Sequence, residues 1–176
     1  LSNGNYHLIE KKVVIEGQKT AYFSEKFLEI TVPVTTKEQI KEIKKTVTHI
    51  AKKHDEEPYK ALATTQQAIF HQLEEQDEID AAAIFDKVFE EKPLAREAAQ
   101  LAITEERVPE KIAVTNVPKY ERKYSKQKFK LDNGIEITIP SEIYENKEMV
   151  EFINNPDGSV SVLIKNIESI LNKFNA

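Results

Sequence analysis

The spacing of apolar residues along the chain changes twice and so divides it into three regions. In the first, up to about residue 33, β-branched residues fill the stretch from Ile9 to Ile15. Glu16-Gly17-Gln18-Lys19 supplies a turn, and a second apolar stretch follows from Thr20 to Val34. This pattern predicts an N-terminal β-hairpin, although Ser24 to Glu29 could instead form a helical turn.

The second region, about residues 36–107, has apolar residues at helical spacing and predicts a helical middle of about four helices. Thr35 and Glu38 have the spacing of a capping box for the first helix. Pro93 is suited to the first turn of the fourth. The expected apolar stripes are Ile40, Ile43, Val47, Ile50 and Ala51; Leu62, Ile69 and Leu73; Ile84, Phe85, Val88 and Phe89; and Leu94, Ala98, Leu101 and Ala102.

The third region, about residues 112–176, alternates apolar and polar residues as strands do. Asp132-Asn133-Gly134 and Asn155-Pro156-Asp157-Gly158 are turn signals within it. Apolar spacing from Asn166 to Phe174 predicts a short closing helix. The fold class is therefore α+β: an N-terminal β-hairpin, a helical middle and a C-terminal antiparallel β-rich region closed by a short helix.

The length of 176 residues fits one ordinary domain or two small lobes. We expect a hairpin plus helical region over residues 1–112 and a β-rich region over 113–176, which together could form one compact unit. Because the chain begins at Leu1 rather than methionine, we also expect a fragment of a longer protein.

Composition removes several kinds of chemistry. The chain has no cysteine, which excludes disulfides, thiolate metal sites and a cysteine nucleophile. No apolar run approaches the roughly 20 residues of a membrane span. Neither a phosphate-binding loop nor a nucleophile elbow occurs, and the four histidines lack a metal-binding spacing. We therefore expect no enzyme, no cofactor, no metal and no membrane partner.

Charge is segregated along the chain, whose formal net charge is −5. Residues 37–54 hold 6 basic and 2 acidic residues, and residues 111–130 hold 7 and 1, giving net charges of +4 and +6. The intervening residues 55–110 hold 5 basic and 15 acidic residues, a net charge of −10. Two basic segments therefore flank a strongly acidic helical block.

The basic segments supply the candidate nucleic-acid-binding residues, which are Lys119, Arg122, Lys123, Lys126, Lys128, Lys130, Lys41, Lys44 and Lys45. A strand over 126–131 would place alternate lysines on one face about 6.6 Å apart, a spacing that could follow a phosphate backbone. Tyr120 and Tyr124 could stack on unpaired bases. Two alternatives remain open: the strand lysines could protect a sheet edge, and those of residues 37–52 could form an ordinary solvated helix face.

Both ends of the chain resemble the bacterial nucleoid-associated protein family in its Gram-positive form. The similar stretches are Lys128–Pro140, Val150–Ile167, Ile9–Lys12 and Tyr22–Leu28. The resemblance covers roughly 65 residues and is vague over the helical middle. It implies a cytoplasmic, non-enzymatic protein of the nucleoid, and it places this chain in the C-terminal portion of longer family members.

Two hypotheses follow. In the first, the lysine-rich segments contribute to chromosome association by contacting DNA with weak sequence preference. In the second, the chain is a protein-interaction or dimerisation module that does not itself touch DNA, because net negative charge repels a polyanion at long range. Candidate partners are therefore DNA, a second copy in a homodimer, and another chromosome-associated protein.

Overall fold

The structure is a computed structural model that describes residues 11, 13–15, 18–20 and 34–172. It divides into two units, Leu1–Thr35 and Thr36–Ala176. In the first unit, β1 (Val13–Ile15) pairs antiparallel with β2 (Gln18–Thr20). The larger predicted N-terminal hairpin, including the second apolar stretch, falls mostly outside the described residues.

The helical middle contains the four expected helices. They are α1 (Thr36–Lys53), α2 (Pro58–Glu75), α3 (Ala81–Val88) and α4 (Pro93–Thr104). Proline occupies the first turn of both α2 and α4, where a missing amide proton costs no intrahelical hydrogen bond. The prediction for this region is confirmed.

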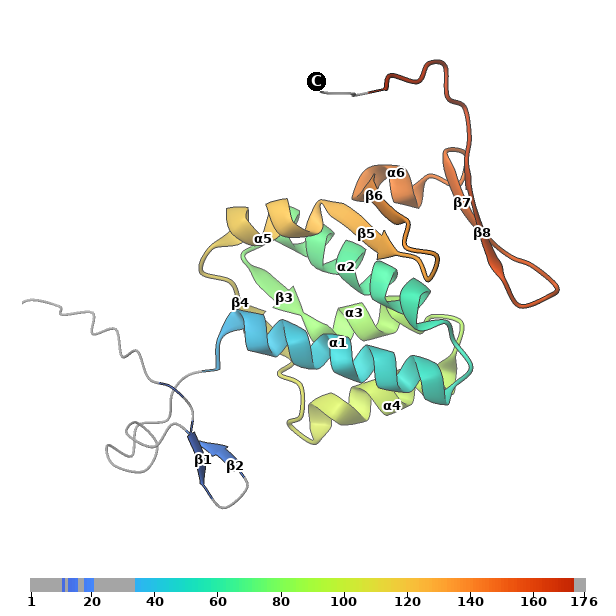
Figure 1. Cartoon of the computed structure of the whole chain (residues 1–176). Helices are drawn as coiled ribbons and strands as arrows, with labels where there is room; N and C mark the ends of the chain where they lie inside the picture. Colours follow the sequence, from blue (N-terminus) through green and yellow to red (C-terminus); the bar gives the residue numbers. More distant parts are fainter. Residues whose placement is uncertain (1–10, 12, 16–17, 21–33, 173–176) are drawn as a thin grey trace, which may run out of the picture. The chain divides into compact units, whose positions relative to one another are not determined.

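The core of the Thr36–Ala176 unit forms around α2, because α1, α3 and α5 all pack against it (Figure 1). The predicted stripe of α1 is confirmed, and Ile43 and Val47 are fully buried. The stripe predicted for α4 is confirmed at Ala102, which is buried, and at Ala98, which packs partly buried against the core. It is wrong at Leu94 and Leu101, which are 71% and 50% exposed. The small side chains of Ala95, Ala99 and Ala102 face the core. Their size lets α4 approach α1 and α3 closely.

A two-stranded ribbon inside this region was not predicted. β3 (Glu78–Asp80) pairs antiparallel with β4 (Lys111–Ala113), and Ile79 and Ile112 face each other in the core. Asp80 then accepts a hydrogen bond from the amide of Ala83 and so caps α3. The acidic connection between α2 and α3 is therefore partly a strand whose last residue serves as a helix cap.

The C-terminal region consists mainly of two antiparallel hairpins. β5 (Lys126–Lys130) pairs with β6 (Glu136–Pro140), and β7 (Val150–Asn154) pairs with β8 (Val160–Ile164). Gly134 and Gly158 occupy the two turns with φ values of 87° and 83°, which glycine adopts without strain. Both predicted hairpins are confirmed.

Two helices in this region were not predicted, and one predicted helix is wrong. α5 (Val117–Tyr124) precedes β5, and the short α6 (Ser141–Glu145) follows β6. The closing helix is absent from 166–172, the part of its range that the structure describes. Asn166 instead has a φ of 55°, and its side-chain Nδ2 donates to the carbonyl oxygen of Glu148. So short a helix is marginal without a packing surface, and Ile170 remains 86% exposed.

Glutamine side chains tie the C-terminal region to α2. Gln127, which is buried, donates from Nε2 to the carbonyl oxygen of Ala63 at 3.0 Å. Gln66 donates to the carbonyl oxygens of Lys126 at 2.8 Å and Tyr124 at 3.2 Å. These bonds cross the domain division expected at residues 112 and 113, and they fix the corner between α5 and β5 against the helical core.

Candidate nucleic-acid interface

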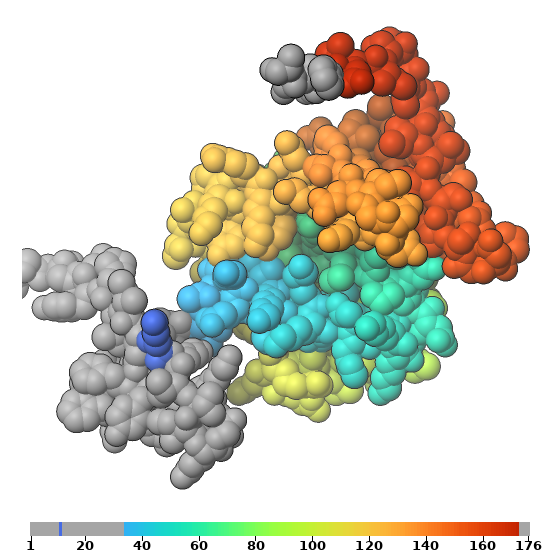
Figure 2. Space-filling model, in the orientation of Figure 1, coloured from blue at the N-terminus to red at the C-terminus, as the bar shows by residue number. Residues whose placement is uncertain are grey.

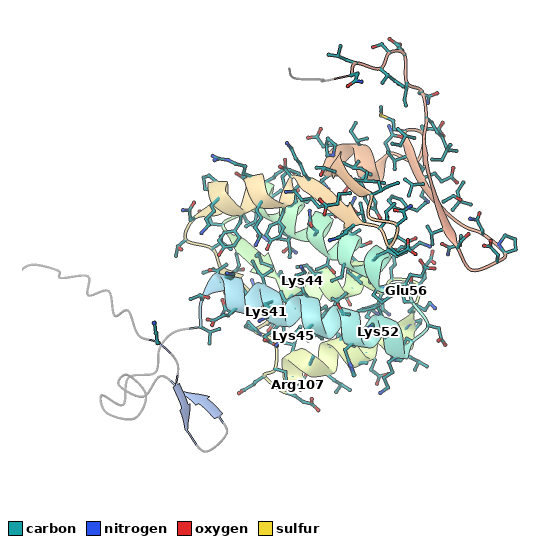
Figure 3. The ribbon with its side chains drawn as sticks, viewed as in Figure 1. Lys41, Lys44, Lys45, Lys52, Glu56 and Arg107 are labelled. Atoms are coloured by element: carbon teal, nitrogen blue, oxygen red, sulfur yellow. The ribbon has the colours of Figure 1, made fainter. Side chains whose placement is uncertain are left out.

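The lysines of α1 lie opposite the side of the helix that enters the core. Lys37, Lys41, Lys44, Lys45 and Lys52 are exposed, while the isoleucine stripe is buried. This division follows from the 3.6-residue period of the helix. Figure 3 labels four of these lysines along α1, namely Lys41, Lys44, Lys45 and Lys52.

The second basic segment turns from helix to strand. The side chain of Asn116 accepts from the amide of Lys119 and caps α5, which carries Lys119, Arg122 and Lys123. β5 then alternates as predicted: Lys126, Lys128 and Lys130 are exposed, and Gln127 is buried between them. The buried glutamine therefore orients the strand so that its lysines face solvent.

The two basic segments meet at one surface depression of about 740 Å³. We call it the lysine hollow and define it by its eight lysines: Lys37, Lys41, Lys44, Lys45 and Lys52 from α1, Lys123 from α5, and Lys126 and Lys128 from β5. Figure 2 shows the blue and cyan surface of α1 beside the yellow and orange surface of α5 and β5. Segments more than 70 residues apart in sequence thus form one cationic surface.

The charges in the hollow are close enough to affect one another. The pKa of Lys123 is lowered from its ordinary value, first by partial burial and then by the positive charges of Lys44, Lys37 and Lys119. Within the described part of the chain, Lys45 is the one lysine of the hollow that forms an ion pair, with Glu42 at 2.7 Å. The hollow therefore holds concentrated positive charge that an anion would stabilise.

The nine candidate residues do not all occupy this surface. Lys41, Lys44, Lys45, Lys123, Lys126 and Lys128 line the hollow. Lys119, Arg122 and Lys130 are exposed but do not line it. Lys130 lies 4.0 Å from Glu136 across the hairpin, and Lys119 lies over the ring of Tyr120.

Tyr124 does not have the role expected of it, whereas Tyr120 is half-buried and its stacking on bases stays a prediction. Tyr124 is only 7% exposed, and its ring stacks on that of Tyr120 with centroids 6.3 Å apart. The ammonium group of Lys123 lies 5.1 Å from the Tyr124 ring centroid. The prediction that Tyr124 stacks on unpaired bases is therefore wrong, because its ring belongs to the core and supports Lys123.

Three residues that line the hollow were not found by the sequence analysis. They are Thr48, His49 and Gln66, which a search for lysine and arginine does not detect. The contribution of Gln66 is to hold the backbone of α5 and β5 in place through its two hydrogen bonds. No pattern in the sequence distinguishes it from Gln67 beside it.

An apolar cavity of about 420 Å³ adjoins the hollow and shares Lys44 and Lys128 with it. The rings of Phe129 and Phe152, whose centroids are 5.0 Å apart, help to line it.

Among the residues that the structure describes, no three or more histidine, aspartate or glutamate side chains gather in a way that could hold a metal ion. In the same part of the chain, no helix has the length and apolar character needed to cross a membrane.

Lysines gathered from two distant segments into one hollow form a cationic surface of the kind that attracts a polyanion. The family model described as Nucleoid-associated protein YejK matches residues 2–172, and the chain belongs to that family. The match includes the helical middle, where the resemblance of the sequence was vague. No curated protein and no solved structure matches the chain.

Membership confirms the broad predictions. The family is one of nucleoid-associated, non-enzymatic proteins, as the resemblance implied. Its description also agrees with the expected location at the nucleoid and with DNA as the polymer concerned.

Proposed function

We propose that this chain contributes to chromosome association by holding the phosphate backbone of duplex DNA in the lysine hollow. The observation that carries the proposal is the convergence of α1 with α5 and β5, which brings eight lysines to one surface. Lysine is a compact point charge and lacks the planar fork that reads guanine bidentately. Binding should therefore depend strongly on salt and weakly on sequence.

Duplex DNA fits this surface better than a single strand does. Nonspecific single-strand sites combine positive charge with exposed aromatic rings on which bases stack. Here the aromatic residue at the hollow, Tyr124, is buried beneath Lys123.

The resemblance of the chain ends also supports assignment to the Gram-positive form of the family.

A second candidate function is that of a protein-interaction module that does not contact DNA. The net charge of −10 over residues 55–110 favours it, because such a block repels DNA and attracts a basic partner. The two functions differ in whether the isolated chain binds DNA at low salt and loses that binding when the hollow is neutralised.

Fluorescence anisotropy with a labelled duplex across a salt series tests the proposal. The triple variant Lys41→Gln, Lys44→Gln and Lys128→Gln should weaken binding and reduce the slope of log K against log salt by about 0.9 for each lost phosphate contact. The matched control changes three lysines outside the hollow, Lys60→Gln, Lys87→Gln and Lys147→Gln. Equal loss in both variants would show that total charge, and not the hollow, governs binding.

A further inference from the structure

Exposed apolar side chains are concentrated at the C-terminal end of the described chain. In the β7–β8 ribbon, Ile153, Val160, Leu163 and Ile164 are between 37% and 51% exposed. Figure 1 shows this ribbon at the margin of the Thr36–Ala176 unit. A two-stranded ribbon is marginally stable by itself, and surface of this kind is typical of an interaction site.

The hydrogen-bond ladder of the ribbon defines which edge of β8 is open. The amide of Lys165 donates to Met149 O at 2.9 Å, and the amide of Asn155 donates to Ser159 O at 2.8 Å. In an antiparallel ladder the direction of the backbone groups alternates along the strand, so odd-numbered residues of β8 bond to β7. The N–H and C=O groups of Val160, Val162 and Ile164 therefore point to the other edge, where no described strand pairs.

The open edge lacks the features that usually prevent strand pairing. β8 has the sequence Val-Ser-Val-Leu-Ile, with no charged residue and no proline. β5 offers a contrast within the same chain, because its alternate lysines discourage pairing at its edge. The edge of β8 is thus a template to which another strand can add.

We propose that β8 pairs antiparallel with β8 of a second copy of this chain, about a two-fold axis at Ser161. The outward backbone groups of Val160 then pair with those of Val162 in the other copy, and the reverse holds by symmetry. This register also places Lys165 beside the turn that carries Asp157 of the second copy, so that opposite charges meet at both ends. Two ribbons become one four-stranded sheet.

The sequence of β8 favours pairing with an identical strand over pairing with a strand from another protein. Because β8 is uncharged, nothing in it repels an identical strand, and the residues that meet across the axis are β-branched pairs, which pack well in sheets. No residue of β8 lines the lysine hollow, and Val160 and Val162 line the apolar cavity that adjoins it. The proposal therefore does not depend on DNA binding.

Cross-linking tests the register directly, because the chain has no cysteine. Ser161 is exposed and would face its own copy in a non-hydrogen-bonded pair, where Cα atoms are about 4.5 Å apart and a disulfide can form. Ser161→Cys should therefore oxidise to a covalent dimer roughly a hundredfold faster than random collision allows at micromolar protein concentration. In the matched control, Ser159→Cys, the new cysteine would lie opposite Leu163 of the second copy and should not cross-link. Equal rates in the two variants would overturn the proposed register.

Sedimentation velocity over a concentration series tests the pairing without a cross-link. The unmodified chain should shift from monomer to dimer as its concentration rises. Val162→Pro removes an amide that points away from β7, so it should abolish the dimer and leave the ribbon bonds intact. Val162→Thr, which keeps the amide and the branched shape, should retain the dimer. A chain that stays monomeric, or a dimer that persists in Val162→Pro, would overturn the proposal.

Discussion

Lys123 lies where the two basic segments meet, and its surroundings explain how the hollow works at the scale of one residue. Its ammonium group lies over the stacked rings of Tyr120 and Tyr124, which hold it in place on one side. Partial burial and the positive charges of Lys44, Lys37 and Lys119 disfavour its charged form. A phosphate in the hollow would counter that repulsion, so the residue is poised to gain from an anion.

This environment predicts an alkaline sensitivity of DNA binding. Because the pKa of Lys123 is lowered, the residue loses its charge at a lower pH than an ordinary lysine does. Affinity should therefore begin to fall while the pH is still below the ordinary lysine pKa of about 10.4, and Lys123→Arg, which stays charged, should make the curve flatter in that range. Anisotropy titrations at fixed salt measure this effect, with Lys147→Arg outside the hollow as control. Identical curves for wild type and Lys123→Arg would contradict the assignment of Lys123 to the site.

At the scale of elements, the sequence predicts those whose pattern is long and repeated. α1 has five core positions at helical spacing, and each hairpin has alternation on both sides of a turn signal. α5 was missed because only Tyr124 of its eight residues is buried, although Asn116 followed by Pro118 was an available start signal. The prediction of a closing helix was wrong for the opposite reason, because that segment has apolar residues at helical spacing but packs against no other element within residues 166–172.

The same distinction applies to the candidate site. Charge counting found both basic segments, and six of the eight lysines of the hollow are among the nine candidate residues. It could not find that they converge, because convergence depends on contacts of α2 with residues far along the chain. Gln66 and Gln127, which make those contacts, resemble any other glutamine in the sequence.

An ion-paired histidine links α2 to α6. His71 lies 2.6 Å from Glu145 through Nε2 and 3.2 Å from Glu74 through Nδ1. The hydrogen bond to Glu145 is the main cause that raises the pKa of His71, and partial burial opposes it. Because the side chains of His71 and Glu145 are more than a third exposed, solvent screening reduces the contribution of this ion pair to the free energy of unfolding to about 0.2–1 kcal/mol.

This contact predicts a pH-dependent part of the folding stability. Since the folded-state pKa of His71 is raised, its stabilisation is fully present below the ordinary pKa of 6.5 and is lost as pH rises through the raised value. Urea unfolding at pH values of about 5.5 and 9 should show Glu145→Gln less stable than wild type at the lower pH and nearly equal at the higher. His49→Gln, on the exposed side of α1, serves as the control. A deficit in Glu145→Gln that is the same at both pH values would contradict the ion-pair account.

At the scale of the whole molecule, the chain combines a net charge of −5 with a concentrated cationic surface. The two act over different distances. Contact between lysines and phosphates operates within the hollow, whereas the acidic block repels DNA across the solvent. Such long-range repulsion fades once the separation exceeds the Debye length, which is about 10 Å at 0.1 M salt.

Removing acidic residues that do not line the hollow should therefore strengthen DNA binding only at low salt. Glu90, Glu91 and Glu97 are exposed and do not line the hollow, and their replacement by glutamine raises the net charge by three. We expect this variant to bind a duplex about threefold more tightly near 10 mM salt and equally near 300 mM, where repulsion is screened. Neutralising Lys41, Lys44 and Lys128 should instead weaken binding at both concentrations, because those residues make contact. Anisotropy at the two salt concentrations separates the effects, and an advantage of the acidic-block variant that persists at 300 mM would show that these glutamates lie at the DNA interface.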